Sequence, residues 1–153
     1  MKSEKLITGN YVCKTQNKTF KLGEKIGKSL HGVEILLLEG GLGAGKTLLT
    51  KGILSALDYD IDEVTSPSFS LVNRYDSKFT VYHLDLWRIE KNAAFAVGLD
   101  EMLDDENCVI IIEWSERLEN LDFERKTYKI KIEGDGVDSR KIEITELNAN
   151  EHE

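Results

Sequence analysis

The stretch LLLEGGLGAGKT, residues 36–47, decides the fold of this chain. The apolar residues over 33–38 predict a buried strand, and the helical spacing of apolar residues over 48–57 predicts a helix. The glycine-rich segment between them fits the pattern G-x-x-x-x-G-K-[ST], in which backbone N–H groups surround a phosphate. A helix that begins near Lys46 directs the positive end of its dipole toward the same phosphate. We therefore predict a nucleoside triphosphate site at this junction, the alternative being a glycine-rich turn that binds nothing.

Each residue type in this loop has a separate task. Lys46 is expected at an exposed loop–helix junction, where its charge faces the β- and γ-phosphates. The Thr47 hydroxyl is placed to bind Mg²⁺. The backbone groups expected around the phosphates belong to Gly41, Leu42, Gly43, Ala44 and Gly45.

Length and composition favour one globular domain with an acidic surface. The chain has 153 residues, is 41% hydrophobic and carries a formal net charge of −8. Nucleic-acid binding depends on neutralising phosphates, so this charge argues against nucleic-acid binding by the chain alone and fits a basic protein partner better. The chain has two cysteines and shows neither a signal peptide nor a membrane span, so we expect a cytoplasmic protein.

The remaining periodicities predict an α/β fold, a P-loop NTPase-like three-layer sandwich with a mostly parallel central sheet and antiparallel hairpin additions. A single domain is expected over 1–153, with a frayed tail at 148–153. Thr15 is expected to cap the first helix and Gly32 to end it, and Gly98 interrupts the last helical pattern. The expected elements are a strand over 6–14, a helix over 16–30, a hairpin of 69–75 and 79–84, a helix over 90–105, a buried strand over 108–112 and a second hairpin of 128–133 and 140–145.

Glu113 is the best candidate for an acidic residue near the metal. It follows the buried strand over 108–112 at its carboxyl end, where ligands bind in open α/β sheets. The alternative is that Glu113 only marks the point where the chain reaches the surface. His83 lies in the segment Tyr82-His83-Leu84-Asp85-Leu86-Trp87-Arg88, where strand periodicity places His83, Asp85 and Trp87 on one side. For His83 alone, a structural strand histidine is favoured over a catalytic base.

Taken together, these motifs resemble the bacterial TsaE (YjeE) family, small ATPases required for threonylcarbamoyladenosine modification of tRNA. The resemblance runs over 15–145 and includes the segments Ser66-Pro67-Ser68-Phe69 and Glu113-Trp114 as well as the glycine loop and the His-x-Asp segment. The chain departs from the usual family pattern at Ser68, where threonine is common, and at Trp87, where tyrosine is common. Ser68 keeps the hydroxyl, whereas Trp87 lacks a phenolic oxygen.

The resemblance implies roles for individual residues, with ATP or ADP and Mg²⁺ as cofactors. Lys46 and Thr47 would take the phosphates and the metal, and Glu113 would be the acidic residue of the metal site. Asp85 would lie near the γ-phosphate and orient water, and the segment 66–69 would respond to the nucleotide state. The residues expected near the nucleotide from elsewhere in the chain are Thr19 or Gln16, close to the base, and Arg140.

The function implied by the resemblance is an ATPase that acts on a TsaD/TsaB-type complex in tRNA threonylcarbamoyladenosine (t6A) modification. Slow hydrolysis is expected without these partners, because the regions 48–58 and 90–106 offer no obvious second arginine finger and Arg88 is the only arginine close to a motif carboxylate. Two alternatives stay open. One is a nucleotide-gated interaction module in which hydrolysis is incidental, and the other is a small-molecule kinase.

Overall fold

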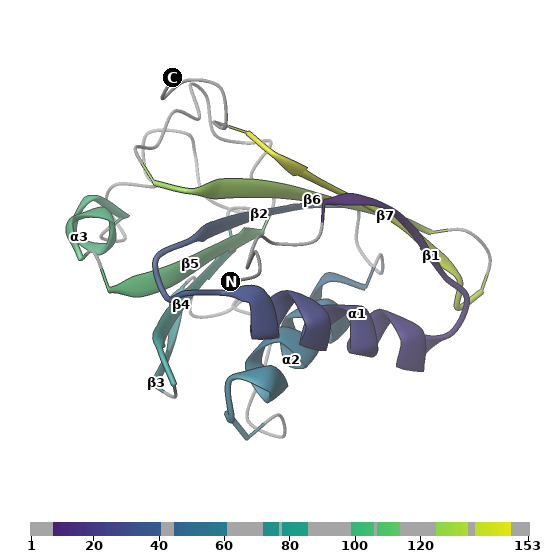
Figure 1. The fold of residues 1–153 in the computed structure, drawn as a ribbon, viewed down its shortest axis with the longest axis horizontal. Coiled ribbons are helices and arrows are strands. Elements are labelled where there is room, and N and C mark those ends of the chain that lie inside the picture. The colour runs from purple at the N-terminus through teal and green to yellow at the C-terminus, as the bar shows by residue number, and fades with distance from the viewer. Residues whose placement is uncertain are drawn as a thin grey trace, which may run out of the picture.

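A seven-stranded sheet forms the middle layer of the protein (Figure 1). The structure is a computed structural model that describes residues 8–40, 45–60, 72–76, 78–85, 99–105, 107–113, 125–134 and 137–147, without the side chains of residues 85, 99 and 100. The elements in chain order are β1 (Gly9–Cys13), α1 (Gln16–Ser29), β2 (Ile35–Glu39), α2 (Lys46–Ala56), β3 (Val72–Asp76), β4 (Thr80–Asp85), α3 (Leu99–Asp104), β5 (Cys108–Glu113), β6 (Thr127–Gly134) and β7 (Arg140–Glu146).

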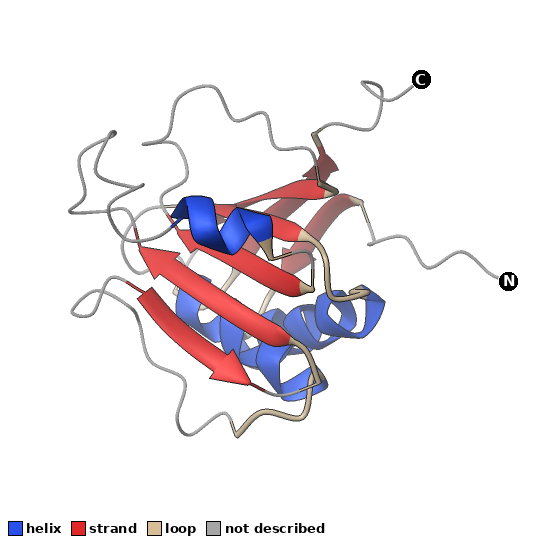
Figure 2. Ribbon diagram, turned by 90° about the vertical axis from the view of Figure 1, so that its left-hand side faces the viewer, coloured by secondary structure: helices blue, strands red, loops and turns tan. Residues whose placement is uncertain are grey.

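The strand order is β1-β7-β6-β2-β5-β4-β3, with β2 at the centre. The four central strands, β6, β2, β5 and β4, pair in parallel, while β7, β1 and β3 add antiparallel pairs at the two ends. Helices α1 and α2 cover one face, and α3 lies on the opposite face (Figure 2). This arrangement confirms the predicted α/β sandwich with a mostly parallel centre and antiparallel hairpin additions.

Both faces of the central strands are buried, which explains their continuous apolar sequences. The α1/α2 face packs alternate residues such as Leu36, Leu38 and Ile111 into one core. The other face packs Leu37, Ile110 and the α3 residue Met102 into a second core. No helix within the described ranges is long and apolar enough to cross a membrane.

Most predicted elements are present, but several boundaries differ. Thr15 caps α1 as expected, its side chain accepting from the Lys18 backbone N–H at 3.1 Å. The first hairpin is shifted: its strands are 72–76 and 80–85, because Asp76 still pairs with Thr80 where a turn was expected. Of the helix predicted over 90–105, the described part is α3, and Gly98 lies outside the described residues. The second hairpin is not peripheral, since β6 also pairs in parallel with β2.

Helices α1 and α2 approach closely enough for their backbones to touch, and glycines make this possible. A Cβ atom on Gly52 would lie 2.2 Å from the Phe20 carbonyl oxygen, and one on Gly23 would lie 2.3 Å from the Leu49 carbonyl oxygen. Gly27 is similarly crowded, because a Cβ atom added there would lie 2.5 Å from the Ile53 carbonyl oxygen. The height of α2 above the sheet, and with it the position of the glycine loop, therefore depends on these contacts.

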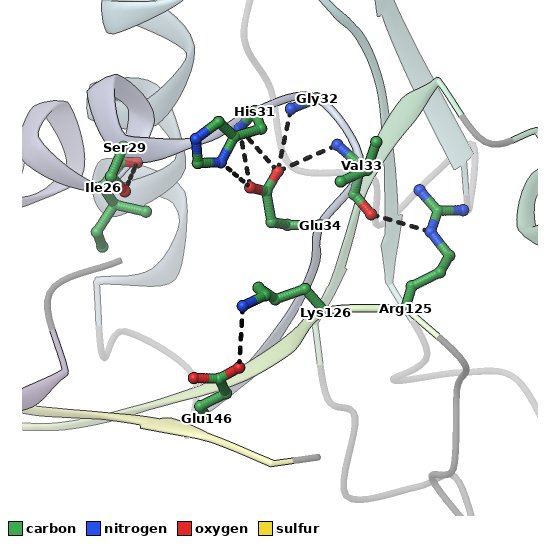
Figure 3. A network of polar contacts seen from close by, with 9 residues as sticks. All are labelled: Ile26, Ser29, His31, Gly32, Val33, Glu34, Arg125, Lys126 and Glu146. Carbon is green, nitrogen blue, oxygen red and sulfur yellow. Dashed lines mark hydrogen bonds and ion pairs between the residues drawn. The ribbon is translucent and has the colours of Figure 1, made fainter. Parts of the chain in front are cut away.

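The turn between α1 and β2 is organised by a buried carboxylate (Figure 3). Glu34 is 3% exposed, and its oxygens accept hydrogen bonds from the backbone N–H groups of His31 at 2.8 Å, Gly32 at 3.1 Å and Val33 at 3.1 Å. Arg125 holds the same turn from the other side, its Nε donating to the Val33 carbonyl at 3.0 Å. Because β2 begins immediately after this turn, the network fixes where the central strand enters the sheet.

We expect Glu34→Ala to lower the free energy of unfolding by about 2–3 kcal/mol, because it leaves three backbone N–H groups of the turn, the buried one of Gly32 among them, without their acceptor. Urea denaturation followed by circular dichroism measures the change. Glu101→Ala, which removes an exposed carboxylate on α3, is the control and should change stability by less than about 0.5 kcal/mol. Equal stabilities of the two variants would contradict a structural role for the Glu34 network.

Candidate functional site

The candidate site lies where the carboxyl ends of the central parallel strands meet the start of α2. β2 pairs with β5 on one side and with β6 on the other, so the winding of the chain changes sides at β2. In open α/β sheets, ligands bind outside the carboxyl ends of the strands at such a point. The loop here runs from Gly40, directly after β2, to Gly45, directly before α2. The predicted phosphate-loop positions Gly41, Leu42, Gly43 and Ala44 lie outside the described residues.

The first turn of α2 is fixed by backbone geometry and by two side chains. Gly45 is the N-cap of α2 and has φ +106°, a conformation that favours glycine. The buried Thr50 hydroxyl donates to the Lys46 carbonyl at 2.9 Å. Thr47, the predicted metal-side hydroxyl, is the second residue of the helix and is half-buried.

Lys46 is buried, which corrects the expectation of an exposed junction. It is 6% exposed, and its Nζ donates to the Gly40 carbonyl oxygen at 2.5 Å. The ammonium group turns back onto the end of β2, so that a carbonyl replaces water as its hydrogen-bond acceptor. The lysine thereby links the two ends of the glycine loop.

Arg140 reaches the same place from the far end of the chain. Its side chain lies against the N-cap of α2: a Cβ atom on Gly45 would be 3.5 Å from Arg140 Nε. The guanidinium also donates to the Ser139 carbonyl at 2.8 Å, within the β6–β7 connection. A second positive side chain therefore stands beside the start of α2, where negative phosphate charge is favoured by the helix dipole.

Glu113 and His83 form a buried pair on the α1/α2 side of the sheet. His83 Nε2 lies 2.6 Å from Glu113 Oε2, and the two side chains are 0% and 3% exposed. The alternative that Glu113 merely surfaces at the end of β5 is therefore wrong. The pairing register sets Glu113 opposite Leu38 of β2 and Asp85 of β4, so it ends its strand beside the glycine loop. The Asp85 backbone thus adjoins Glu113, whereas its side chain lies outside the described residues.

Residues near the start of α1 were predicted to lie close to the base. Thr19 is 1% exposed, and its Oγ1 is 3.5 Å from the Thr15 carbonyl oxygen. It also contacts Cys13: burial raises the pKa of the Cys13 thiol, an effect that the Thr19 hydrogen bond and the Lys18 charge oppose. Gln16 is exposed and its Nε2 donates to Asp138 Oδ1 at 3.2 Å, tying α1 to the same β6–β7 connection that carries Arg140.

The contact between His83 and Glu113 is the feature that the sequence did not predict. A signal for it was present, because the two-residue strand period places His83 and Asp85 on one face, and parallel pairing with β5 places Glu113 on that face too. What was missing was the strand pairing that brings together two side chains 30 positions apart in the chain. The segment 66–69, Trp87 and Trp114 lie outside the described residues.

Within the described part of the chain, no three His, Cys, Asp or Glu side chains gather to hold a metal ion.

The family model described as threonylcarbamoyl adenosine biosynthesis protein TsaE matches residues 13–142. A tRNA threonylcarbamoyladenosine biosynthesis protein TsaE from Nostoc sp. is 34% identical over 87% of this chain and 83% of its own length. The protein of the same name from Treponema pallidum is 33% identical over 70% of this chain and 78% of its own length. The crystal structure of Bacillus subtilis YdiB superimposes with a TM-score of 0.69 and 26% identity, covering 98% of this chain and 93% of that one.

Proposed function

This chain belongs to the TsaE family of threonylcarbamoyl adenosine biosynthesis proteins, and we propose that it serves that pathway as an ATP-binding and ATP-hydrolysing protein. Hydrolysis would reset a TsaD/TsaB-type complex that carries out t6A modification of tRNA, in the cytoplasm where tRNA is available. The observation that carries the proposal is the junction of β2, the glycine loop and α2, with Lys46 and Arg140 both placed against it.

The residues present suit Mg²⁺ bound together with the nucleotide. The donors would be the Thr47 hydroxyl and the Glu113 carboxylate, both of them hard oxygen ligands. The hydrogen bond that Glu113 accepts from His83 goes to Oε2, so Oε1 is the oxygen left for a metal. When bound, Mg²⁺ supplies positive charge that offsets the charge developing on the phosphates.

Some side chains of the site would then serve nucleotide binding and others hydrolysis. Lys46 would exchange the Gly40 carbonyl for phosphate oxygens, which are better acceptors because they are charged. Arg140 would add a second positive group beside the N-cap of α2. Asp85, adjacent to Glu113 in the register, is proposed to orient the attacking water. With no cation supplied by a partner to stabilise the transition state, turnover should be slow.

The charge of the chain favours a protein partner over tRNA itself. A net charge of −8 opposes binding to a polyanion, so the chain would act on the proteins that modify tRNA. The sequence alternatives, a nucleotide-gated module and a small-molecule kinase, differ from this proposal in what stimulates phosphate release.

The test is phosphate release from ATP by the purified chain alone, with TsaD- and TsaB-type proteins, and with a panel of small acceptors. We expect slow release alone and clear stimulation by the protein partners. Nucleotide-dependent association without stimulated hydrolysis would support the gated module instead. Transfer of phosphate to an acceptor would support the kinase, and absence of nucleotide binding would overturn all three.

We expect Glu113→Gln to keep nucleotide affinity within a few-fold but to lose most turnover and the dependence on Mg²⁺. The metal stabilises charge that develops mainly in the transition state, so its loss should lower kcat more than it raises KM. Steady-state phosphate release over a range of Mg²⁺ concentrations measures both effects. Wild-type turnover in this variant would assign the metal to another carboxylate, with Asp85 the first to examine.

A further inference from the structure

His83 is a fully buried polar residue of the site, and the proposed function gives it no direct contact with the nucleotide or the metal. Its side chain is 0% exposed, its Nε2 contacts Glu113 at 2.6 Å, and its Nδ1 has no hydrogen-bond partner within the described residues. A buried polar atom without a partner is unfavourable, so a position that served packing alone would favour an apolar side chain. Histidine at this position therefore points to a role for the Nε2–H group.

We propose that His83 is a positioning residue, whose Nε2–H holds Glu113 Oε2 and thereby presents Oε1 to Mg²⁺. This inference rests on the proposed function. With Glu113 ionised, as a metal ligand has to be, Nε2 carries the proton of the 2.6 Å contact, since an ionised carboxylate only accepts hydrogen bonds. A glutamate side chain without such a partner can rotate about its terminal bond, and a ligating carboxylate is commonly fixed by a hydrogen bond from outside the metal's own ligands.

The ring of His83 is itself held in place by neighbouring aromatic rings. Its centroid lies 6.4 Å from that of Tyr75, with the planes tilted by 37°. Tyr75 in turn contacts Tyr59 edge-on, with centroids 4.8 Å apart, and accepts a hydrogen bond at its hydroxyl from Asn73 Nδ2 at 3.3 Å. Tyr59 follows the end of α2, so the row Tyr59–Tyr75–His83 connects the imidazole, through Tyr75 of β3, to the segment after α2.

The position on the sheet explains how this residue of β4 can act on Glu113. Val81 and His83 lie on the α1/α2 side of β4, as Val109, Ile111 and Glu113 do on β5. His83 pairs with Ile111, which precedes Glu113 by two residues on β5. The imidazole therefore approaches the Glu113 carboxylate from the side nearer the middle of the strands. Glu113 is the last residue of β5, so it lies at the end of the strands where the nucleotide is proposed to bind.

The test compares two substitutions of His83, one that keeps a hydrogen-bond donor to Glu113 and one that removes it. His83→Gln retains an N–H donor close to the position of Nε2, whereas His83→Leu fills similar space without one. Tyr75→Phe is the matched control, because it removes a hydroxyl from the same aromatic row and leaves the His83 donor intact. Electron paramagnetic resonance measures Mn²⁺ affinity in the presence of a non-hydrolysable ATP analogue, and calorimetry measures affinity for the analogue in EDTA.

We expect His83→Leu to weaken Mn²⁺ about 10-fold or more, with analogue affinity in EDTA within about two-fold of wild type. His83→Gln should recover most of the loss, and Tyr75→Phe should match wild type. If the leucine variant does not fold, His83→Asn replaces it, since its shorter amide does not reach Oε2. If wild type and the variant lacking the donor bind Mn²⁺ equally well, the role of His83 is overturned and the proposed function is not. A wild-type protein that binds the analogue without any metal dependence overturns the proposed metal site and this inference with it.

Discussion

Lys46→Ala should reduce ATP affinity on the order of 100-fold or more, because it removes the ammonium group that donates to the Gly40 carbonyl at the start of the glycine loop. The side chain is 6% exposed, so its charge would interact with the phosphates away from bulk water, where such interactions are strong. Titration calorimetry with ATP and Mg²⁺ measures the loss. The variant should keep its circular dichroism spectrum, since helix α2 retains its backbone hydrogen bonds and its buried Thr50 contact.

The burial of Lys46 adds a second, smaller consequence. The alanine variant loses the bond to the Gly40 carbonyl, so its free energy of unfolding should fall by about 1–3 kcal/mol. Lys51→Ala is the control, because Lys51 lies on the same helix and is half-buried, yet takes part in none of the hydrogen bonds described for the loop. It should bind ATP like the wild type. Undiminished ATP affinity in Lys46→Ala would show that the glycine loop is not the phosphate site.

Gly52→Ala should be among the most destabilising single substitutions in this protein. The new methyl group would lie 2.2 Å from the Phe20 carbonyl oxygen and 3.0 Å from Gly23 Cα, both of them backbone atoms that cannot rotate away. Alanine is favoured over glycine within a helix by about 1 kcal/mol, but overpacking of this kind costs about 1–3 kcal/mol and occasionally more. We expect a net loss of about 2 kcal/mol or more, which lowers Tm by several degrees.

The same substitution should weaken nucleotide binding, although residue 52 lies away from the loop. Helix α2 has to move away from α1 to accommodate the methyl group, and its first turn carries Gly45, Lys46 and Thr47. Differential scanning calorimetry and ATP titration measure the two effects. Gly134→Ala is the matched control, because among the described residues no atom beyond its chain neighbours lies within 4 Å of its added methyl, and it should change stability by less than about 0.5 kcal/mol. Similar melting temperatures for both variants would contradict the close helix contact.

Local patterns in the sequence determined the elements and the place of the site. A continuous apolar run followed by glycines, lysine and threonine has few conformations open to it, and it correctly placed β2 and α2 around a loop with Gly45 at positive φ. Thr15 likewise predicted the start of α1, because an N-cap acts on N–H groups only three residues away. The alternation of apolar and polar residues over 128–133 and 140–145 predicted the last hairpin for the same reason, because a hairpin pairs residues that are close in the sequence.

The contacts between segments distant in the chain were decided by the tertiary structure alone. Burial of Lys46, the approach of Arg140 to Gly45 and the pairing of β6 with β2 all depend on which surfaces the folded chain brings together. The His83–Glu113 pair depends on the order of β4 and β5 in the sheet, which no local pattern fixes. The sequence by itself therefore determined which residues could carry the chemistry, since residue type and spacing are local properties. Only the packed sheet and helices decided which of those side chains meet, because strand order and helix separation depend on burial across the whole chain.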